Sequence, residues 1–478
     1  MKIHNRRTFL KLAAASAAAA GSGSRLAWSA TSQESAGHGS GNAEAAWQTT
    51  AGKRFQPIAA PEWKKGVATR AMSIHLDPER KYQDILGFGA AMTGASCYLL
   101  KHAPEAKRRA ILEDCFGPQG LRFSVARTTI GSSDYSLSAY SFDESPTPDP
   151  ELKHFSIDHD KAYILPMLRA AAGVNPELFY FSSPWSPPAW MKDNNSLLGG
   201  AMVDTYFPAY ANYFVKFLQD YEAAGVKIRA VTVQNEVDTN QDGRMTQCEW
   251  GQEYEMNFVK GHLGPTFAKQ NIDTKIWILD HNYNLWGRAV DELSDPEVYK
   301  YVDGVAWHGY VGKPDAMTRV HDMFPDKHAY WTEGGPDITD PAYATDWAKW
   351  SETFTGILRN WARCIVSWNL VLDEHGKPDI GPFHCGGVVT LHSGTNKVTR
   401  SGQFWAFAHY SKLIDRGSRV IGSWGEFPQI SHVAVENPDG SRVLVVTNRG
   451  GEQALQVTLH DQAMDLLLPP DSITSVKW

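Results

Sequence analysis

The stretch I-R-A-V-T-V-Q-N-E, residues Ile228–Glu236, decides the fold class that we expect for this chain. Its apolar centre is too short for a helix and is rich in β-branched residues, so it predicts a buried strand. The stretch ends with an amide and a carboxylate, Asn235 and Glu236. Polar side chains at the carboxyl end of a buried strand are typical of the functional rim of a barrel of parallel strands.

Further segments on both sides of this stretch have the same apolar character, and amphipathic helical segments separate them. Alternating strands and helices predict a parallel sheet of the α/β class, and eight strands close it into a (β/α)8 TIM barrel. The predicted strands are Ile85–Gly89, Phe123–Ile130, Leu178–Ser183, Ile228–Glu236, Lys275–Asp280, Val305–His308, His328–Glu333 and Cys364–Asn369. The predicted helices include Ala103–Cys115, Tyr206–Tyr221 and Gln403–Ile414.

A second, smaller domain is predicted after residue 414, where the hydrophobic period changes to two. Short alternating segments separated by turn residues indicate an all-β sandwich. A possible earlier strand at Ala71–Leu76 would add to it. We therefore predict a barrel over residues 84–414 and a discontinuous sandwich domain formed by residues 54–83 and 415–478. The later strands of this domain are expected at Arg419–Ser423, Ile430–Val435, Arg442–Thr447, Leu455–His460 and Ile473–Trp478.

The N-terminus carries the features of an export signal. Residues Asn5–Lys11 read N-R-R-T-F-L-K, an alanine-rich apolar run covers Leu12–Ala20, and small residues near Ala27–Ala30 offer a cleavage site. This order is typical of a twin-arginine (Tat) signal peptide, so we expect residues 1–30 to engage the Tat export machinery and the mature protein to be periplasmic or secreted. Residues 31–53 are predicted to be a disordered linker. No later stretch approaches the roughly 18 apolar residues of a membrane span, so no transmembrane segment is expected.

The amino-acid composition favours some classes of function and argues against others. The net charge of −7 comes without a basic stripe, which argues against nucleic acid as a partner. Seventeen Trp residues suit a protein that binds sugars, because flat aromatic faces stack on sugar C–H groups, although most of them are also explained as core residues. The five cysteines include no C-x-x-C pair, so neither a zinc ribbon nor a disulfide framework is indicated.

A second predicted strand, His328–Glu333, also ends in a glutamate. Two carboxyl groups at the ends of two strands of one barrel can face each other across a shared substrate. Hydrolysis of a glycosidic bond with retention needs such a pair, with one group as acid and the other as nucleophile about 5–5.5 Å away. A single glutamate would be read as a solvated charge, whereas Glu236 and Glu333 together predict catalysis. The neighbouring Asn235 could hydrogen-bond the 2-hydroxyl of the sugar.

Several motifs in the order seen here resemble glycoside hydrolase family 30, and most closely its glucosylceramidase branch. They are G-F-G-A-A-M-T at 87–93, S-P-W-S-P-P-A-W-M-K at 183–192, Q-N-E at 234–236, W-T-E at 331–333 and S-W-N-L at 367–370, and the resemblance covers about residues 84–478. It implies a (β/α) barrel with a flanking β-sandwich, hydrolysis of β-glycosides with retention, and no requirement for a metal or cofactor.

The resemblance also implies individual roles. Glu236 matches the family's acid/base and Glu333 its nucleophile. Arg127 matches an arginine near the nucleophile, where its charge would keep that carboxylate ionised. Asp134 matches a ligand of sugar hydroxyls. The remaining matches are two sugar-contacting tryptophans, Trp185 and Trp368, and the histidine and tyrosine of W-H-G-Y, His308 and Tyr310.

The chain departs from the family at three places on the leaving-group side. Val237 follows the acid/base where the family usually has proline, the loop Asp238–Thr246 lacks aromatic residues, and Phe383–Cys385 differs from the lysosomal enzymes. We expect a glucosylceramidase-like exo-β-glucosidase, with an endo-β-1,6-glucanase or a β-xylosidase of the same family as the alternative, because cleft shape depends on loops outside the strand ends.

Two other classes of function are less consistent with the residues. His281, His308 and His384 with Cys385 could be read as metal ligands, but no spacing such as H-x-x-x-H links them, so we expect hydrogen-bonded or buried histidines and no metal site. A carbohydrate-binding protein without activity would keep its tryptophans and lose a glutamate. This chain keeps both glutamates, and its expected partner is a β-glycoside: an oligosaccharide, glucan or glycolipid.

Overall fold

The structure, a computed structural model, describes residues 43–66, 68–239 and 244–478. The predicted signal peptide, most of the predicted linker and part of the loop that follows Glu236 lie outside these ranges. None of the helices in the described part of the chain combines the length and the apolar character needed to cross a membrane.

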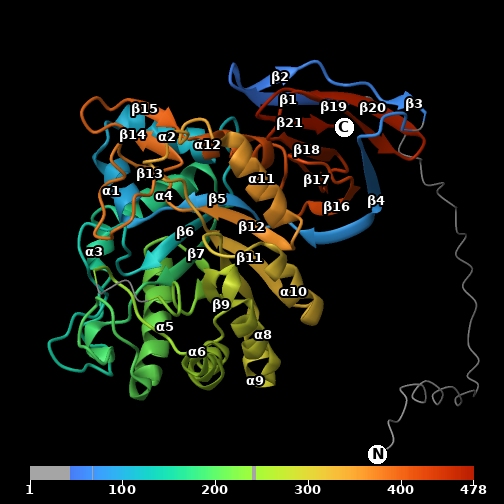
Figure 1. Cartoon of the computed structure of the whole chain (residues 1–478). Helices are drawn as coiled ribbons and strands as arrows, with labels where there is room; N and C mark the ends of the chain where they lie inside the picture. The colour runs from blue at the N-terminus through green and yellow to red at the C-terminus, as the bar shows by residue number, and fades with distance from the viewer. Residues whose placement is uncertain (1–42, 67, 240–243) are drawn as a thin grey trace, which may run out of the picture. The chain divides into compact units, whose positions relative to one another are not determined.

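Eight parallel strands close into a barrel in the order β10-β11-β12-β5-β6-β7-β8-β9, and helices surround them (Figure 1). The predicted TIM barrel is therefore confirmed. Its strands are β5 Gly87–Ala91, β6 Val125–Ile130, β7 Phe179–Pro184, β8 Ile228–Thr232, β9 Lys275–Asn282, β10 Val302–His308, β11 His328–Glu333 and β12 Ala362–Ser367.

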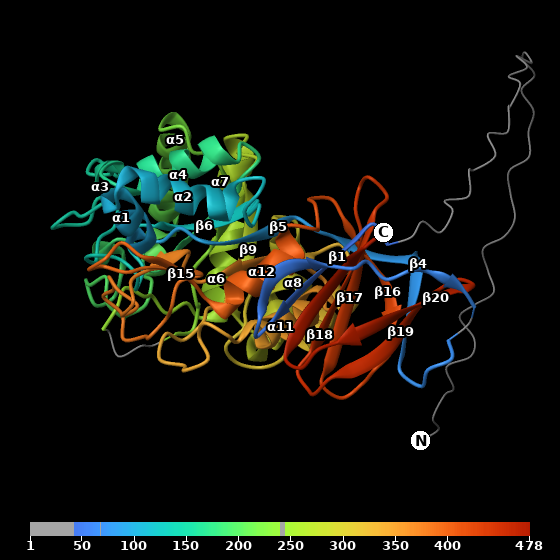
Figure 2. The same cartoon turned by 90° about the horizontal axis from the view of Figure 1, so that it is seen from above.

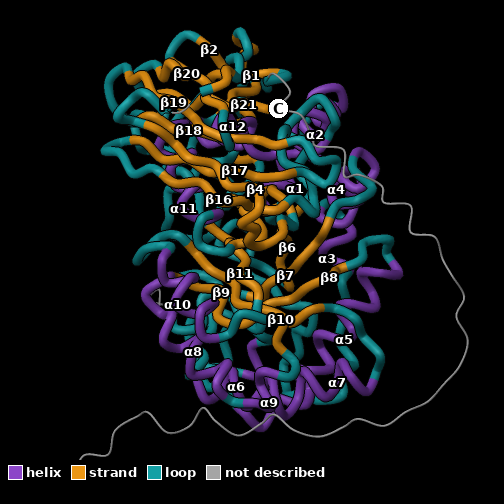
Figure 3. Tube along the Cα trace, turned by 90° about the vertical axis from the view of Figure 1, so that its right-hand side faces the viewer, coloured by secondary structure: helices purple, strands orange, loops and turns teal. Residues whose placement is uncertain are grey.

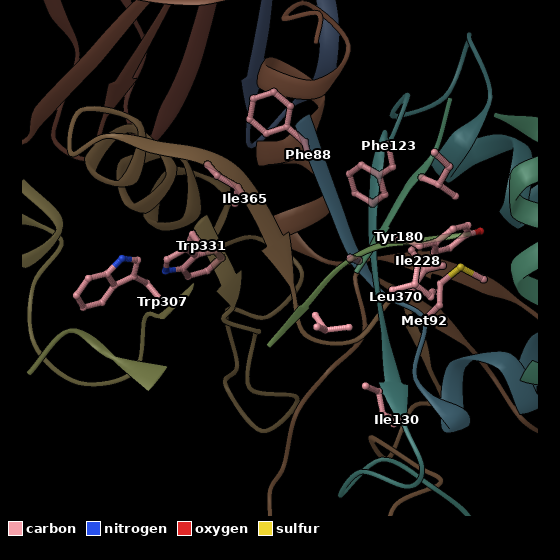
Figure 4. Close-up of a cluster of buried hydrophobic side chains, with 14 of the residues drawn as sticks. Phe88, Met92, Phe123, Ile130, Tyr180, Ile228, Trp307, Trp331, Ile365 and Leu370 are labelled. Carbon is pink, nitrogen blue, oxygen red and sulfur yellow. The ribbon is translucent and has the colours of Figure 1, made fainter. Parts of the chain in front are cut away.

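Both faces of the barrel strands are buried, which explains their nearly continuous apolar sequence. The interior is filled by a compact cluster that includes Phe181, Trp277 and Tyr330, so the barrel is packed and has no pore through its lower half. The opposite faces pack against the helices, and Figure 4 shows part of that larger cluster, with Phe88 of β5 and Ile365 of β12 among the labelled side chains.

The three helices predicted from periodicity are present as α2 Glu105–Phe116, α5 Phe207–Ala223 and α12 Gly402–Ser411. Figure 3 shows helices around the strands of the barrel. The other helices of four or more residues are α1 Gly94–His102, α3 Asp158–Lys161, α4 Ile164–Val174, α6 Gln252–Phe258, the π-helix Val259–Leu263, α7 Gly264–Lys269, α8 Trp286–Ser294, α9 Pro296–Tyr299, α10 Asp315–Met323 and α11 Trp347–Leu358; short 3-10 turns lie at Ala189–Met191, Asp204–Tyr206 and Tyr283–Leu285.

The second domain is a ten-stranded sheet in the order β2-β1-β21-β18-β17-β16-β4-β19-β20-β3, seen from above in Figure 2. Strands from both halves of this order bury side chains in one common core, so the sheet folds over itself as a sandwich. Its strands are β1 Ala45–Thr50, β2 Lys53–Ile58, β3 Lys64–Lys65, β4 Ser73–Asp84, β16 Arg419–Trp424, β17 Ile430–Glu436, β18 Arg442–Asn448, β19 Gln453–Leu459, β20 Gln462–Leu468 and β21 Ser472–Lys477.

The predicted disordered linker over residues 31–53 is wrong at its C-terminal end. Residues from Ala45 onward form β1, which pairs antiparallel with β21, so that Ala46 lies opposite Val476. One edge of β1 pairs with β2, the next strand along the chain, and the other edge pairs with β21 at the far end of the sequence. Local composition does not contain the second of these pairings.

The sandwich is fastened to the barrel through α11 and α12. The buried imidazole of His409 on α12 is 2.8 Å from the Thr49 hydroxyl and 2.7 Å from the Ser475 hydroxyl. On α11, the Ser351 hydroxyl lies 2.6 Å from that of Thr447. The strands that were not predicted include β20 and the three strands of a small sheet, β13 Val371–Leu372, β14 Val389–Leu391 and β15 Val398–Arg400.

Candidate active site

The two glutamates reach the barrel rim in different ways. Glu333 is the last residue of β11, as predicted. β8, in contrast, ends at Thr232, so the prediction that the strand continues to Glu236 is wrong. Glu236 lies in a turn with φ 52°, and its N–H donates to the Asp280 carbonyl at 3.0 Å. The turn is therefore held by the neighbouring strand β9 and not by the ladder of β8.

A cavity of about 360 Å³ opens at this rim, and both glutamates line it. A volume in this range is at the small end of ligand pockets, so it suits a small number of sugar rings. Of the predicted site residues, seven line the cavity, whereas Arg127 and His308 lie behind its wall and act through other side chains. The lining consists of Asp134, Trp185, Asn235, Glu236, Thr239, Met245, His281, Asn282, Tyr310, Val311, Glu333, Trp368, Phe383 and Cys385.

His308 lies between the two glutamates. Its Nδ1 is 3.2 Å from Glu236 Oε1, and its Nε2 is 3.8 Å from Glu333 Oε2. The same Nε2 lies 3.0 Å from Asp280 Oδ1. Both carboxyl groups thus approach one buried imidazole ring, which places them on the same side of the barrel and around the same cavity.

Arg127 is completely buried, and three of its acceptors belong to side chains of the site. Its Nη1 donates to Glu333 Oε2 at 2.6 Å, and its Nη2 donates to Asn235 Oδ1 at 2.8 Å and to Asp280 Oδ2 at 2.7 Å. The guanidinium also lies 4.8 Å from the ring centre of Trp185, which stacks on Trp368 with a centroid distance of 5.1 Å. One cation therefore fixes the nucleophile candidate, the amide beside the acid candidate and one wall of the cavity.

Asp280 joins these groups and was not among the predicted site residues. Oδ2 accepts hydrogen bonds from Arg127, from the Ser183 hydroxyl and from the Thr232 hydroxyl, while Oδ1 accepts from the Thr332 hydroxyl and from His308. Burial alone would raise the pKa of Asp280, but the Arg127 charge and the hydrogen bonds hold it far below its ordinary range. Asp280 is therefore a permanent anion at the centre of the site.

The charges around the cavity set the protonation of its groups. Burial lowers the pKa of His308, but the Glu333 charge and the hydrogen bonds to Asp280 and Glu236 outweigh it and raise this pKa to about 9. Burial raises the pKa of Glu236, yet the hydrogen bond and charge of His308 bring it below its ordinary value. Burial raises the pKa of Glu333, and the charges of His308 and Arg127 only partly oppose this. The proton of this cluster is held most firmly on His308.

Two side chains offer polar atoms to a ligand in the cavity. Asp134 is 4% exposed, and within the described residues its Oδ1 has no hydrogen-bond partner. Burial and the charges of Glu333 and Glu236 raise the pKa of Asp134, so it gains from a hydroxyl donor. The Tyr310 hydroxyl donates to Glu333 Oε1 at 3.0 Å while its ring is 47% exposed. The predicted positions of both residues at the site are consistent with sugar binding.

The structure brings two of the four residues weighed as metal ligands next to Glu236. One ligand atom each from Glu236, His281 and His308 lie within 4.8 Å of one another. His384 and Cys385 are not part of this group, although Cys385 lines the cavity. Sequence spacing could not reveal the grouping, because the three residues come from the ends of three different strands.

A (β/α)8 barrel whose rim holds two carboxyl groups over a cavity walled by tryptophans has the architecture of a glycoside hydrolase. Comparison with known families identifies the group. Residues 85–414 match the glycosyl hydrolase family 30 TIM-barrel domain, and residues 417–476 match the glycosyl hydrolase family 30 beta sandwich domain. The chain belongs to glycoside hydrolase family 30 and is a hydrolase of glycosidic bonds.

Relatives of two kinds are similar to this chain. An endo-1,6-β-D-glucanase of Neurospora crassa is 33% identical over 410 residues, which is 81% of this chain and 83% of the relative. The lysosomal acid glucosylceramidase of Mus musculus is 30% identical over 431 residues, 85% of this chain and 83% of the relative. Among solved structures, an endo-β1,6-glucanase superimposes with a TM-score of 0.82 at 29% identity, covering 92% of this chain and 100% of its own.

Proposed function

We propose that this protein hydrolyses β-glucosidic bonds by double displacement, with retention of anomeric configuration. The observation that carries the proposal is that Glu236 and Glu333 line one cavity and lie 3.2 and 3.8 Å from the two nitrogens of the same His308 ring. These contacts place both carboxyl groups around one substrate position, and double displacement needs such a pair about 5–5.5 Å apart.

Glu333 is the nucleophile in this proposal. The Arg127 guanidinium at 2.6 Å and the Tyr310 hydroxyl at 3.0 Å stabilise its ionised form and fix its direction. The carboxylate attacks the anomeric carbon, the bond to the leaving oxygen breaks, and a covalent glycosyl-enzyme results. Asp134 binds sugar hydroxyls during both steps, and Asn235, held by Arg127, faces the 2-hydroxyl.

Glu236 is the acid and base. It protonates the leaving oxygen, and in the second step it takes a proton from the water that releases the sugar. The resting site keeps the proton on His308, and Glu236 lies at 3.2 Å to receive it through the hydrogen bond to Nδ1. Thr239 donates to the other oxygen of Glu236 at 2.9 Å, so the carboxyl group keeps one orientation during the transfer.

The substrate that we favour is β-1,6-linked glucose. A relative named as an endo-1,6-β-glucanase is 33% identical to this chain, and the cavity rim carries two partly exposed aromatic residues, Tyr310 and Phe383, on which further sugars can stack. Glucosylceramide is the second candidate, because Val311 and Phe383 also give the rim an apolar edge that suits a lipid. A β-xyloside is the third candidate substrate.

Two experiments test these proposals. Proton NMR of the reaction with an aryl β-glucoside should show β-glucose before mutarotation, and initial α-glucose would overturn the retaining mechanism. Turnover should then be compared on linear β-1,6-gluco-oligosaccharides, glucosylceramide in detergent and an aryl β-xyloside. A higher kcat/KM on glucosylceramide than on every β-1,6-glucoside would overturn the choice of substrate and leave the mechanism intact.

Export by the twin-arginine route is a separate proposal. It is supported by N-R-R-T-F-L-K at residues 5–11 and by the five cysteines, which are all unpaired and of which four are buried. A chain that folds in the reducing cytoplasm before export needs no disulfides. Replacing Arg6 and Arg7 by lysine should leave the protein in the cytoplasm with its N-terminus uncleaved. Normal export of this variant would contradict the proposal.

A further inference from the structure

Three side chains at the edge of the cavity direct ligand atoms at one point. Glu236 Oε1 lies 3.2 Å from His308 Nδ1 and 3.7 Å from His281 Nδ1. The three residues offer one ligand atom each within 4.8 Å of one another. Glu236 and His281 also line the cavity, so the point is reachable by a small ion.

The hydrogen bonds around His281 leave its Nδ1 with a lone pair. Its Nε2 lies 2.7 Å from Asp238 Oδ1, so Nε2 carries the hydrogen. The Asn282 amide nitrogen lies 3.3 Å from Nδ1 and donates to it. The orientation of this amide is fixed, because Asn282 Oδ1 accepts hydrogen bonds from the N–H groups of Tyr310 and Val311. Nδ1 is therefore the acceptor atom of this ring, and a metal ion bound there would replace the 3.3 Å contact with Asn282.

His308 is oriented in the same way, but in the resting site its Nδ1 shares a proton with Glu236, so a metal ion must displace that proton. Its Nε2 donates to Asp280 at 3.0 Å, and its Nδ1 faces Glu236. Each imidazole is thus oriented by a carboxylate at Nε2 and presents Nδ1 to the same glutamate. A carboxylate behind a histidine is the usual support of a histidine that binds a metal, because it fixes the ring and raises the basicity of the ligating nitrogen.

We propose that Glu236, His281 and His308 form a binding site for Zn²⁺. Two imidazole nitrogens and one carboxylate oxygen are a zinc donor set, and the fourth tetrahedral position faces the cavity, where water can occupy it. Zinc bonds of about 2.0–2.1 Å place tetrahedral ligand atoms roughly 3.3 Å apart. The glutamate lies 3.2 and 3.7 Å from the two imidazoles, close to this spacing, and all three ligand atoms lie within 4.8 Å of one another.

The charge around the site favours a divalent cation. Asp238 and Asp280 lie behind the two histidines, and Glu333 lies 3.8 Å from His308 Nε2. With Glu236 these make four carboxyl groups around the site, and Arg127 offsets part of their charge. Magnesium and calcium prefer oxygen ligands, so the two imidazoles select a transition metal over them.

Bound zinc would inhibit the enzyme. The metal occupies the carboxylate of Glu236, which then cannot pass a proton to the leaving oxygen, and its fourth ligand fills the cavity beside Glu333. This consequence rests on the role proposed for Glu236. The binding itself does not, because it depends only on the three ligand atoms and the carboxylates behind them.

Titration of the metal-free full-length chain with ZnCl₂ in a calorimeter tests the site directly. We expect one Zn²⁺ per chain at micromolar or lower concentration and no response to MgCl₂. Replacing His281 by alanine should weaken binding at least tenfold, and Asp238→Asn should weaken it by about 10- to 100-fold, as loss of a carboxylate behind a metal histidine does. His154→Gln changes an exposed histidine far from the cavity and is the matched control.

A second variant separates a lost ligand from a damaged fold. His281→Cys supplies a different zinc ligand from the same backbone position, so it should retain binding that His281→Ala loses. With Co²⁺ as the probe, wild-type protein and His281→Cys should both give the visible absorption of a tetrahedral site, at wavelengths that differ because of the thiolate. Zinc binding that His281→Ala leaves unchanged, or an absence of binding in the wild type, would overturn the site.

Inhibition is measured separately. Turnover of an aryl β-glucoside should fall as ZnCl₂ is added, and EDTA should restore it. If zinc binds at these residues without inhibiting, the site is confirmed and the acid role of Glu236 is contradicted. If the metal-free enzyme is active and zinc neither binds nor inhibits, the proposed function stands and the zinc site is overturned.

Discussion

Replacing Asp280 by asparagine separates charge from shape at the centre of the site. The side chain is fully buried and accepts hydrogen bonds on both oxygens. Asparagine fits the same space but has an acceptor on one side and a donor on the other. If its amide nitrogen faced Arg127, two donors would oppose each other, so we expect it to face His308 and Thr332.

This orientation of the asparagine amide changes the protonation of His308. Its Nε2 must become the acceptor of the new amide, which leaves the only ring proton on Nδ1, and the ring loses its positive charge beside Glu236 and Glu333. Thr332 keeps a partner, because its hydroxyl also lies 3.3 Å from the Trp307 carbonyl. The variant therefore keeps most hydrogen bonds while the Arg127 charge loses one of its two anionic partners.

The variant should change two measurable quantities, the free energy of unfolding and the turnover. Removing one partner of a buried ion pair costs about 3–5 kcal/mol, and asparagine recovers about 1 kcal/mol through a neutral hydrogen bond, so unfolding should require about 2–4 kcal/mol less free energy. Turnover should fall by about 10²- to 10³-fold, which corresponds to roughly 3–4 kcal/mol in the barrier, since the proton and the nucleophile both lose their supporting charge.

The assay is kcat on an aryl β-glucoside together with urea unfolding, with Asp303→Asn as the matched control. Asp303 also accepts hydrogen bonds from barrel-core side chains, Tyr330 at 2.7 Å and Trp277 at 3.3 Å, but it has no contact with either glutamate among those described. The control should lose stability and keep its turnover within about threefold. Turnover of Asp280→Asn within tenfold of wild type, or equal to that of the control, would refute the reasoning.

Three further predictions concern single residues. Glu333→Gln should lower turnover by at least about a thousandfold with the fold intact, and near wild-type kcat would contradict its role as nucleophile. Glu236→Ala should slow substrates with poor leaving groups far more than activated aryl glycosides, because only the former need protonation, and equal losses would contradict its role as acid. Burial lowers the pKa of His409 from 6.5 to about 3, so below pH 6.5 the unfolded chain binds a proton at this residue and the folded chain does not. The wild type should therefore lose about 1.4 kcal/mol of stability per pH unit below 6.5, whereas His409→Gln should lack this slope. Urea unfolding of both proteins from pH 7 to 5 measures the slopes, and an equal loss of stability in both would contradict the prediction.

The barrel could be predicted because its strands are buried on both faces and so appear as short β-branched runs. The errors lie where distant contacts override such runs. Val233 continues the apolar pattern of β8, but the N–H groups of Asn235 and Glu236 are taken by carbonyls of Pro184 and Asp280, and the strand ends early. β1 lies between β2, with which it forms a local hairpin, and β21 at the other end of the sequence, and its local pattern does not contain the second pairing.

The same limit explains which site residues were found. Polar residues at the ends of β8 and β11 were recognised, and the same rule applied to β9 would have found Asp280, because D-H-N follows the apolar K-I-W-I-L at 275–279. That His308 contacts both glutamates could not be predicted, since it depends on the distances between the ends of β8, β10 and β11. The sequence identified the ends of strands, and the structure shows which of them meet.

These contacts show that the geometry of the site depends on β9 more than on β8. Leu279 and Asp280 both have positive φ, 70° and 44°, inside an otherwise regular strand. Such a kink persists only where its surroundings stabilise it. Glu255 accepts the freed N–H of Leu279 at 3.0 Å and is itself held by Arg288 at 2.7 Å. The kink directs Asp280 at Arg127 and His308, and its carbonyl holds the Glu236 N–H. Both catalytic candidates therefore depend on one strained turn of β9, which an ion pair outside the barrel keeps in place.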